Sequence, residues 1–482
     1  MNAQGLEVLD GKNLVDSIGP HLTEDQAKAI FALGAEAVVF ALLAQAKLIG
    51  ELQRPKANQV DPSTPSAHIP PYHKPSKSRR SKPKGAQPGH SGHRRQTPVA
   101  IDQIQDHTLA TCPDCDSPVR ERGNPRERVI EDIPSGIKPV VTRHVIHGYW
   151  CRKCRKTVEP VVTDALPKSC IGLHTGVLSS WLHYQLGSTL SQILDVFNYH
   201  LQLKLTAGGL VHTWNRIGGI LGPWYDEIRE QALQSAVLNA DETGWRVDGK
   251  THWLWCFTSK ELTYYSIDES RGSAILRRMF QREFQGVLLC DFYNSYNAVV
   301  CKAKQRCLPH LMRDVKRTEK LKRPSEDWPE FRKRLMRLVR DSLRLGRIRQ
   351  ELPPEQLESR RARLHARLTK LIALEWRHKE CKRLVKRLRR HQNEMFTFLE
   401  YEGVPADNNH AERQIRPAVI MRKNSYANGS ETGAATQSLL MSVFQTLKQR
   451  GLNPIEEIGK AIRTYLKTGS IPQLPTISTA SG

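Results

Sequence analysis

The sequence predicts a multidomain protein of the α+β or α/β class, built around a mixed β-sheet. Three features of the 482-residue chain predict this fold. Apolar, strand-like runs between residues 236 and 310 twice end in an acid, a helical stretch at 311–400 follows them, and two Cys-x-x-Cys pairs precede them. We therefore expect a mixed sheet core with a helical insertion, preceded by a small zinc ribbon-like module and an N-terminal helix.

The composition restricts the partners and the compartment of the protein. A formal net charge of +24 and a pI near 9.7 favour a polyanionic partner. The most apolar stretch, residues 37–46, is far shorter than the roughly 20 residues of a transmembrane helix, and the N-terminus lacks a signal-peptide pattern. In the cytosol, Cys-x-x-Cys pairs favour metal binding over disulfides. We therefore expect a cytoplasmic location and no membrane partner.

Residues 1–53 are predicted to contain a long helix. The run Thr23-Glu24-Asp25-Gln26 is typical of a helix start, with a hydroxyl cap followed by early acids. Apolar residues then recur at intervals of three and four, and Pro55 follows the expected end. Such a helix either pairs with another helix, in the same chain or in a homo-oligomer, or is a core helix of a larger domain. The sequence leaves both alternatives open.

Residues 54–98 are predicted to form a basic flexible linker. Pro, Ser and Gly recur there and aromatic residues are nearly missing, so the segment cannot bury enough apolar surface to order itself. The linker is either a solvated tether or a basic arm that binds phosphates through counterion release.

Residues 99–168 are predicted to form a zinc-binding module. Cys112, Cys115, Cys151 and Cys154 make two chelating pairs that suit a tetrahedral structural Zn²⁺ site. Strand-like runs at 128–133 and 140–150 fill the space between the pairs. Two pairs in one small segment disfavour the redox alternative. The basic side chains beside the second pair suit contacts with a polyanion, although zinc could equally serve only to fold the module; they are Arg152, Lys153 and Arg155.

Residues 169–235 are predicted to be helical, with helices near 176–186, 189–201 and 207–221, the last capped by Thr206. Two helices around a short turn can present the second to a DNA groove. A plain helical subdomain is the alternative, and no set of base-reading residues is visible.

The region 236–450 is predicted to be the catalytic domain. Strands at 251–259, 262–267 and 287–290 and a helix at 273–280 accompany three acids: Asp241, Asp291 and Glu412. Two carboxylates on neighbouring strands and a third on a helix can hold two divalent cations roughly 4 Å apart, and hard cations prefer such oxygen ligands. A single acid after a strand is usually a turn or cap residue. Together, however, the acids follow the order of an RNase H-like nucleotidyltransferase domain.

Three blocks carry a resemblance to a known family. Asn-Ala-Asp-Glu-Thr at 239–243, Asp-Phe-Tyr-Asn-Ser-Tyr at 291–296 and Asn-Asn-His-Ala-Glu-Arg-Gln-Ile-Arg-Pro at 408–417 resemble the catalytic blocks of DDE transposases of bacterial insertion-sequence family sixty-six. The resemblance runs from about residue 84 to 465 and includes the upstream zinc module. It implies that Asp241, Asp291 and Glu412 bind two Mg²⁺ or Mn²⁺ ions.

The same resemblance implies further site residues. Cys-x-x-His-x-x-Arg at 307–313 places His310 and Arg313 near the active site, although Asp314 and Val315 replace the aromatic residue that often follows. The basic insertion at 311–400 either flanks DNA ends or consists of exposed helical faces. Four cations after the third acid are expected to bind DNA near the scissile phosphate: Arg413, Arg416, Arg422 and Lys423.

These observations predict an insertion-sequence transposase at the bacterial nucleoid. It would bind the element's terminal inverted repeats and target DNA, cleave DNA and transfer strands with a divalent metal. A homo-oligomer and accessory proteins of the same element are implied partners. A nuclease of the same fold without strand transfer and a non-catalytic DNA-binding repressor remain the alternatives. Residues 451–482 are expected to form a closing helix at 454–468 and a tail whose last dozen residues are disordered.

Overall fold

The computed structural model describes most of the chain from residue 100 onward and a short part before it. The chain divides into two compact units, residues 1–90 and 91–482. In the first unit the structure describes helix α2 (Glu24–Ala32), so the predicted helix start is confirmed. Most of the predicted helix beyond it, and the whole predicted linker 54–98, lie outside the described residues. The described residues are 24–32, 34, 35, 38, 39, 42, 100–120, 129, 130, 136–319 and 327–476.

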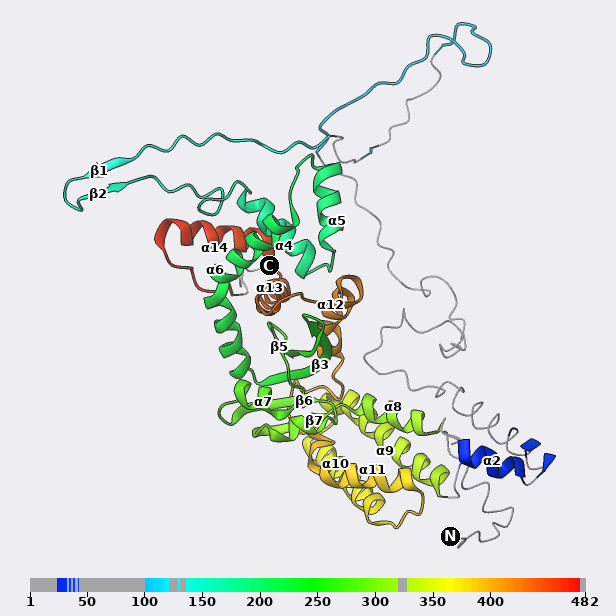
Figure 1. The fold of residues 1–482 in the computed structure, drawn as a ribbon. Helices are drawn as coiled ribbons and strands as arrows, with labels where there is room; N and C mark the ends of the chain where they lie inside the picture. The colour runs from blue at the N-terminus through cyan, green and yellow to red at the C-terminus, as the bar shows by residue number, and fades with distance from the viewer. Residues whose placement is uncertain are drawn as a thin grey trace, which may run out of the picture. The chain divides into compact units, whose positions relative to one another are not determined.

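A five-stranded mixed sheet lies at the centre of the second unit (Figure 1). Its order is β5-β4-β3-β6-β7, with antiparallel pairing among the first three strands and parallel pairing of β3 with β6 and of β6 with β7. Three antiparallel strands followed by two parallel ones form an RNase H-like core, as predicted. The strands are β3 (Val237–Val247), β4 (Lys250–Thr258), β5 (Thr263–Asp268), β6 (Phe284–Cys290) and β7 (Cys301–Arg306).

Strand β6 is apolar on both faces because it separates two hydrophobic cores. Leu288 and Cys290 belong to the core that also contains helix α6, whereas Val287 and Leu289 belong to the core of the helical insertion. Since side chains alternate along a strand, a strand covered on both sides needs a continuous apolar run. The apolar run at 287–290 that predicted this strand is therefore explained by the burial of both faces of the strand.

One of these cores is covered by helices from both ends of the domain. Helices α6 and α13 pack against each other and against β5 (Figure 1). Helices α4, α5 and α6 share this core with the sheet, and the predicted boundary at residue 235 stays a prediction. Thr206 caps α6 as expected, but the helix continues past Pro223. The elements are α4 (Leu173–Tyr184), α5 (Leu190–Asp195), η2 (Val196–His200), α6 (Ala207–Leu233), α7 (Ser273–Met279), η3 (Asn294–Ala298), α13 (Glu431–Gln449) and α14 (Pro454–Thr468).

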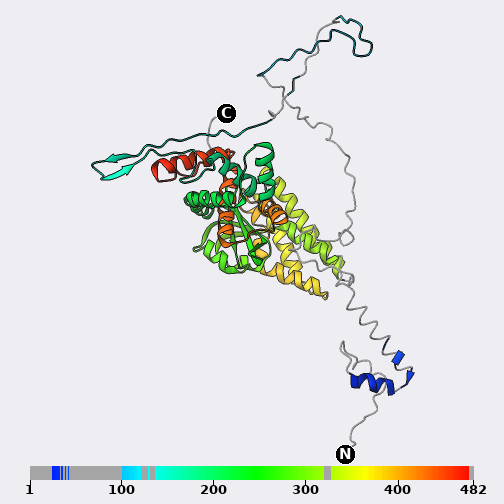
Figure 2. The same cartoon turned by 45° about the horizontal axis from the view of Figure 1, so that its top comes forward.

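The predicted insertion forms a helical layer on the other side of β6 (Figures 1 and 2). Its last predicted helix, 379–399, ends instead at Arg390 and continues as two 3₁₀ turns. The Gln305 side chain donates to the Met395 carbonyl and accepts from the Phe398 amide, and these bonds hold the chain out of a continuous helix. The elements are α8 (Leu308–Glu319), α9 (Trp328–Ile348), η4 (Arg349–Glu351), α10 (Pro354–Ala373), α11 (Lys379–Arg390), η5 (Gln392–Glu394) and η6 (Thr397–Leu399).

The cysteine-containing segment has less regular structure than predicted. A short hairpin joins β1 (Tyr149–Cys151) to β2 (Lys156–Val158), and residues 140–148 form no strand. Val140 and Val141 are more than nine-tenths exposed, so no sheet or helix buries them. The predicted strand at 140–150 is therefore wrong except at its end, because β-propensity without packing does not hold a strand.

Part of the tail that was expected to be disordered packs against α6. Residues 471–476 are described, Leu474 is buried, and Trp224 donates its indole N–H to the Pro472 carbonyl at 2.7 Å. Arg450 donates to the Pro475 carbonyl at 2.6 Å. The expectation of disorder is thus wrong for these residues. Within the described ranges, the helices are all too short or too polar to cross a bilayer.

Candidate active site

The sheet brings the first two predicted acids together. Asp241 lies on β3 and Asp291 directly follows β6, and these two strands are parallel neighbours. Asn239 is paired with Leu289, so the same register continued by two residues places Asp241 beside Asp291. Alternation along the strand puts the Asp241 side chain on the face shared with Asn239.

A buried asparagine fixes the helix that carries the third acid. Glu412 lies in the first turn of α12 (Asn409–Ser425). The Asn408 side chain, fully buried, accepts from Asn239 at 2.9 Å and donates to the Ala240 carbonyl at 2.8 Å. The start of α12 is therefore attached to β3 at Asn239 and at Ala240, next to Asp241. The sequence did not predict this role. The only signal that could have indicated it was an asparagine just before a predicted helix.

The site concentrates negative charge. Burial and the carboxylates of Glu242 and Asp291 raise the pKa of Asp241 to about 8, and Glu412 adds to the effect. Burial and Asp291 also raise the pKa of Glu242. Neighbouring carboxylates that disfavour one another's ionisation are typical of sites that attract cations.

Glu242 has a structural environment. Its side chain is only 2% exposed, accepts from the Arg271 guanidinium at 2.8 Å and accepts from the Tyr296 hydroxyl at 2.6 Å. Arg271 also lies over the Tyr293 ring, which follows Asp291 closely in the chain. Glu242 therefore holds the loop after β6 against β3, and its carboxylate points away from solvent.

The third acid is bound to α8. Arg313 donates to the Glu412 carboxylate at 2.6 Å, and His310 lies 3.7 Å from the same oxygen. Within the described ranges, ligand atoms of Cys307, His310 and Glu412 all lie within 4.8 Å of one another, whereas the three predicted acids form no such group. His310 and Arg313 thus lie beside the acids, as the resemblance implied. The Glu412 carboxylate is therefore paired with Arg313 and is not grouped with those of Asp241 and Asp291.

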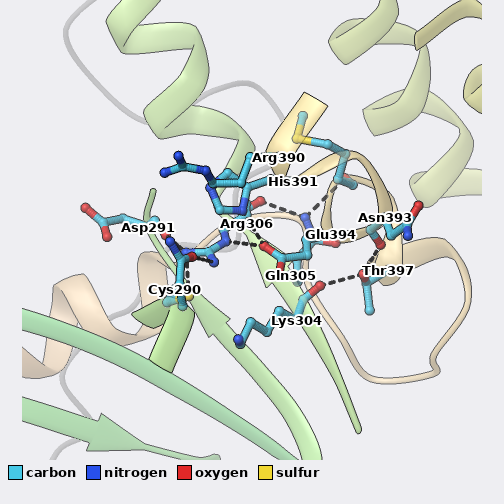
Figure 3. A network of polar contacts seen from close by, with 12 residues as sticks. Cys290, Asp291, Lys304, Gln305, Arg306, Arg390, His391, Asn393, Glu394 and Thr397 are labelled. Atoms are coloured by element: carbon cyan, nitrogen blue, oxygen red, sulfur yellow. Dashed lines mark hydrogen bonds and ion pairs between the residues drawn. The ribbon is translucent and has the colours of Figure 1, made fainter. Parts of the chain in front are cut away.

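A buried arginine connects Asp291 to the end of the insertion (Figure 3). The Arg306 side chain is fully buried at the end of β7, donates to the Asp291 carbonyl at 2.8 Å and donates to Glu394 at 2.5 Å. His391 contacts the same Glu394 oxygen at 2.7 Å. The backbone of the second acid is therefore fixed from within the protein, by a residue that the sequence analysis did not select.

The cations predicted to bind DNA fall into two groups. Arg413, Arg416 and Lys423 are exposed on α12, and Arg152, Lys153 and Arg155 are exposed in the β1–β2 hairpin. Arg422 differs, because its half-buried guanidinium donates to the Thr243 hydroxyl at 3.1 Å and to the Gly244 carbonyl. Arg422 therefore supports β3 close to Asp241.

The four predicted zinc ligands form two local pairs. Cys112 donates and accepts backbone hydrogen bonds across a turn that contains Cys115, and the Cys154 amide donates to the Cys151 sulfur at 3.4 Å. Hydrogen bonds lower the pKa of the Cys115 thiol, mainly those from Ser117, and the pKa of Cys151, mainly that from the Cys154 amide. In the part of the chain that the structure describes, these thiols form no group of three or four within 4.8 Å.

The fold and the positions of the acids define the class of protein. It has an RNase H-like domain with carboxylates at neighbouring parallel strands, and two cysteine pairs precede this domain. Residues 172–436 match the family model described as Transposase IS66 family. Residues 110–155 match the zinc-finger binding domain of transposase IS66. Because the first match covers more than half of the chain, the protein belongs to the IS66 family of transposases, and the predicted resemblance is confirmed.

Curated relatives extend the likeness along most of the chain. The uncharacterized protein y4qI of Sinorhizobium fredii (strain NBRC 101917 / NGR234) is 24% identical over an alignment 387 positions long, and the match covers 70% of this chain and 68% of that protein. The uncharacterized protein y4jD of the same strain is 22% identical over an alignment 427 positions long, and the match covers 78% of this chain and 79% of that protein.

Proposed function

We propose that this transposase cleaves DNA at the ends of its insertion sequence and joins the freed ends to target DNA. The observation that carries the proposal is the position of Asp241 and Asp291 on adjacent parallel strands, with Glu412 attached to the same strand through Asn408. Family membership supports DNA as the substrate. Because chromosomal DNA is the substrate, the bacterial nucleoid is the expected place of action.

The acids fit a pair of Mg²⁺ or Mn²⁺ ions. Their oxygen ligands suit hard cations, and a cation would stabilise the Asp241 carboxylate against the burial and the neighbouring carboxylates that together raise its pKa to about 8. When bound, such ions activate a water or a 3′-hydroxyl and stabilise the leaving oxygen of an in-line displacement. Asp241 and Asp291 would hold them from the sheet, and Glu412 would join after its carboxylate leaves Arg313. Arg313 is then free to bind a phosphate oxygen.

The cysteine pairs fit one structural Zn²⁺ ion. Each pair has a backbone turn that directs hydrogen bonds to sulfur and lowers a thiol pKa, which favours the thiolate that zinc binds. Cys112, Cys115, Cys151 and Cys154 would complete a tetrahedral site when the two pairs meet. The exposed Arg152, Lys153 and Arg155 would then contact DNA phosphates.

Two element ends must meet before they are joined, so the working form is proposed to be a homo-oligomer. The N-terminal helix is the proposed contact, because most of its predicted length follows an apolar pattern. Accessory proteins encoded by the same element remain proposed partners.

Strand transfer on a duplex that carries the element's terminal repeat tests the proposal. The wild-type protein in Mg²⁺ is expected to join that duplex to target DNA, and Asp291→Asn is expected to bind the duplex without cutting or joining it. Cleavage without joining would favour the nuclease. Binding without cleavage, even with the element's accessory proteins added, would favour a DNA-binding repressor.

A further inference from the structure

A basic cavity lies between the second catalytic acid and the helical insertion. Its volume is about 810 Å³, and its walls come from the loop after β6, from α8 and from α11. Asp291 contributes to one wall, and α11 contributes a row of cations to another. Six Lys or Arg side chains and three carboxylates line the cavity: Arg313, Arg317, Arg383, Lys386, Arg387, Arg390, Asp291, Asp314 and Glu380.

Helix α11 is docked so that its cationic face is turned to this cavity. Its apolar face, which includes Leu384 and Leu388, is buried in the core of the insertion. On the cavity side, Asp314 of α8 accepts from Arg383 at 3.0 Å and from Arg387 at 2.5 Å. Asp314 stands where the family often has an aromatic residue. In this chain it therefore attaches α11 to the helix that carries His310 and Arg313.

Of the α11 cations that line the cavity, two have no carboxylate partner among the described residues. Lys386 is exposed and, among the residues that the structure describes, makes no ion pair. Arg390 donates to the amide oxygen of Asn294, three residues beyond Asp291, at 3.4 Å. Because residues four apart on a helix lie on one face, Lys386 and Arg390 form a short cationic row that ends beside the loop of Asp291.

We propose that this cavity binds the sugar-phosphate backbone of the DNA strand next to the scissile phosphate, with Lys386 and Arg390 contacting successive phosphates. The inference deepens the proposed function and rests on it, because the scissile phosphate is located by Asp241 and Asp291. Backbone phosphates suit the cavity, because Lys and Arg without carboxylate partners bind phosphates irrespective of base sequence. The insertion would thus hold the flank of the reacting bond.

The salt dependence of binding gives the first test. We expect the double variant Lys386→Gln/Arg390→Gln to lower the slope of log K against log salt by about 0.9 for each lost contact. The full-length protein is titrated with the terminal-repeat duplex in the absence of a divalent cation. The matched control is Lys379→Gln/Lys382→Gln, two exposed lysines of α11 outside the cavity. It removes the same charge and is expected to change the slope less.

Neutral methylphosphonates at single positions identify the phosphates. With the wild-type protein, a methylphosphonate beside the scissile bond is expected to weaken binding roughly tenfold, as for one charged hydrogen bond. With Lys386→Gln/Arg390→Gln the same substitution should have little further effect, whereas with the control variant it should keep its full effect. If the methylphosphonate weakens binding equally in the cavity variant and in the control variant, the proposal is overturned. It is also overturned if the cavity variant loses affinity for one base sequence only, because that result indicates contacts with bases.

The proposed function and this inference fail in different ways. If the wild-type protein neither cuts nor joins the duplex, the proposed function fails, although the phosphate map can still be read from binding. If the wild-type protein joins ends, the proposed function stands. If the cavity variant then matches the control variant in the salt dependence of binding and in the effect of each methylphosphonate, the cavity assignment is wrong.

Discussion

At the scale of single residues, the ion pair of the buried Arg306 with the partly buried Glu394 makes stability depend on pH. Burial alone would raise the pKa of Glu394, but the hydrogen bond from His391 and the charge of Arg306 outweigh it and lower the pKa to about 2. The pKa is lower in the folded state, so the stabilisation is complete above the ordinary value of 4.5 and is lost as the pH falls towards 2.

We predict that Glu394→Gln lowers the free energy of unfolding at pH 7 by about 3 kcal/mol, because each pKa unit corresponds to about 1.4 kcal/mol. The loss should shrink between pH 4.5 and 2, where the wild-type carboxylate takes up its proton. Urea denaturation at several pH values measures both effects. Glu402→Gln, at an exposed position, is the control. A constant difference between variant and wild type across this pH range would contradict the prediction.

A second residue-scale prediction concerns Asn408. Asn408→Ala leaves the Asn239 amide and the Ala240 carbonyl without partners in a buried place, which costs about 1–3 kcal/mol. Because the same bonds fix the start of α12, strand transfer should fall by more than DNA binding does. Asn409 is exposed one residue later, so Asn409→Ala should change neither the free energy of unfolding nor strand transfer measurably. If both variants behave alike in denaturation and joining assays, Asn408 does not position Glu412.

At the scale of elements, β6 approaches the turn between α6 and β3 too closely for a side chain at Gly286. A Cβ atom there would lie 2.3 Å from the Ser235 carbonyl oxygen and 2.9 Å from that of Ala236. We predict that Gly286→Ala destabilises the protein by several kcal/mol, because backbone must move. Gly219→Ala, on an exposed position of α6 with open space around it, should stabilise by about 0.5–1 kcal/mol. Thermal unfolding of the two variants measures the loss of stability in one and the gain in the other. Equal changes in the unfolding temperature of the two variants would contradict the prediction.

Local signals determined which elements could be predicted. Helix α14 has the predicted bounds because Asn453 caps its start, Pro454 occupies its first position and Gly469 ends it in the left-handed region. The end of α11 could not be predicted, since Gln305, far away in the sequence, binds the chain after it. The apolar strands with terminal acids located Asp241 and Asp291. The buried contacts of Asn408 and Arg306 depend on tertiary packing. An asparagine before a predicted helix indicates at most a helix cap, which Asn408 does not make with its side chain, and Arg306 had no local signal.

At the scale of the whole molecule, the cysteine-containing segment takes no part in the two hydrophobic cores of the second unit. None of the described residues between 100 and 158 belongs to either hydrophobic core, and the first contributor after them is Leu166. A segment with so little buried apolar surface depends on its metal for folding. Zinc should therefore affect the module and leave the sheet and its helices intact.

We predict one Zn²⁺ per chain, lost on chelation or in Cys151→Ser. Chelation should make residues 100–160 sensitive to protease while the thermal transition of the remaining domain is unchanged, because no core contact is removed. Metal analysis, limited proteolysis and calorimetry measure this, with Cys170→Ser, an exposed cysteine outside the pairs, as the control. Affinity for the terminal repeat should fall together with zinc content if Arg152, Lys153 and Arg155 bind DNA. Unfolding of the whole protein on chelation would instead show that the module supports the catalytic core.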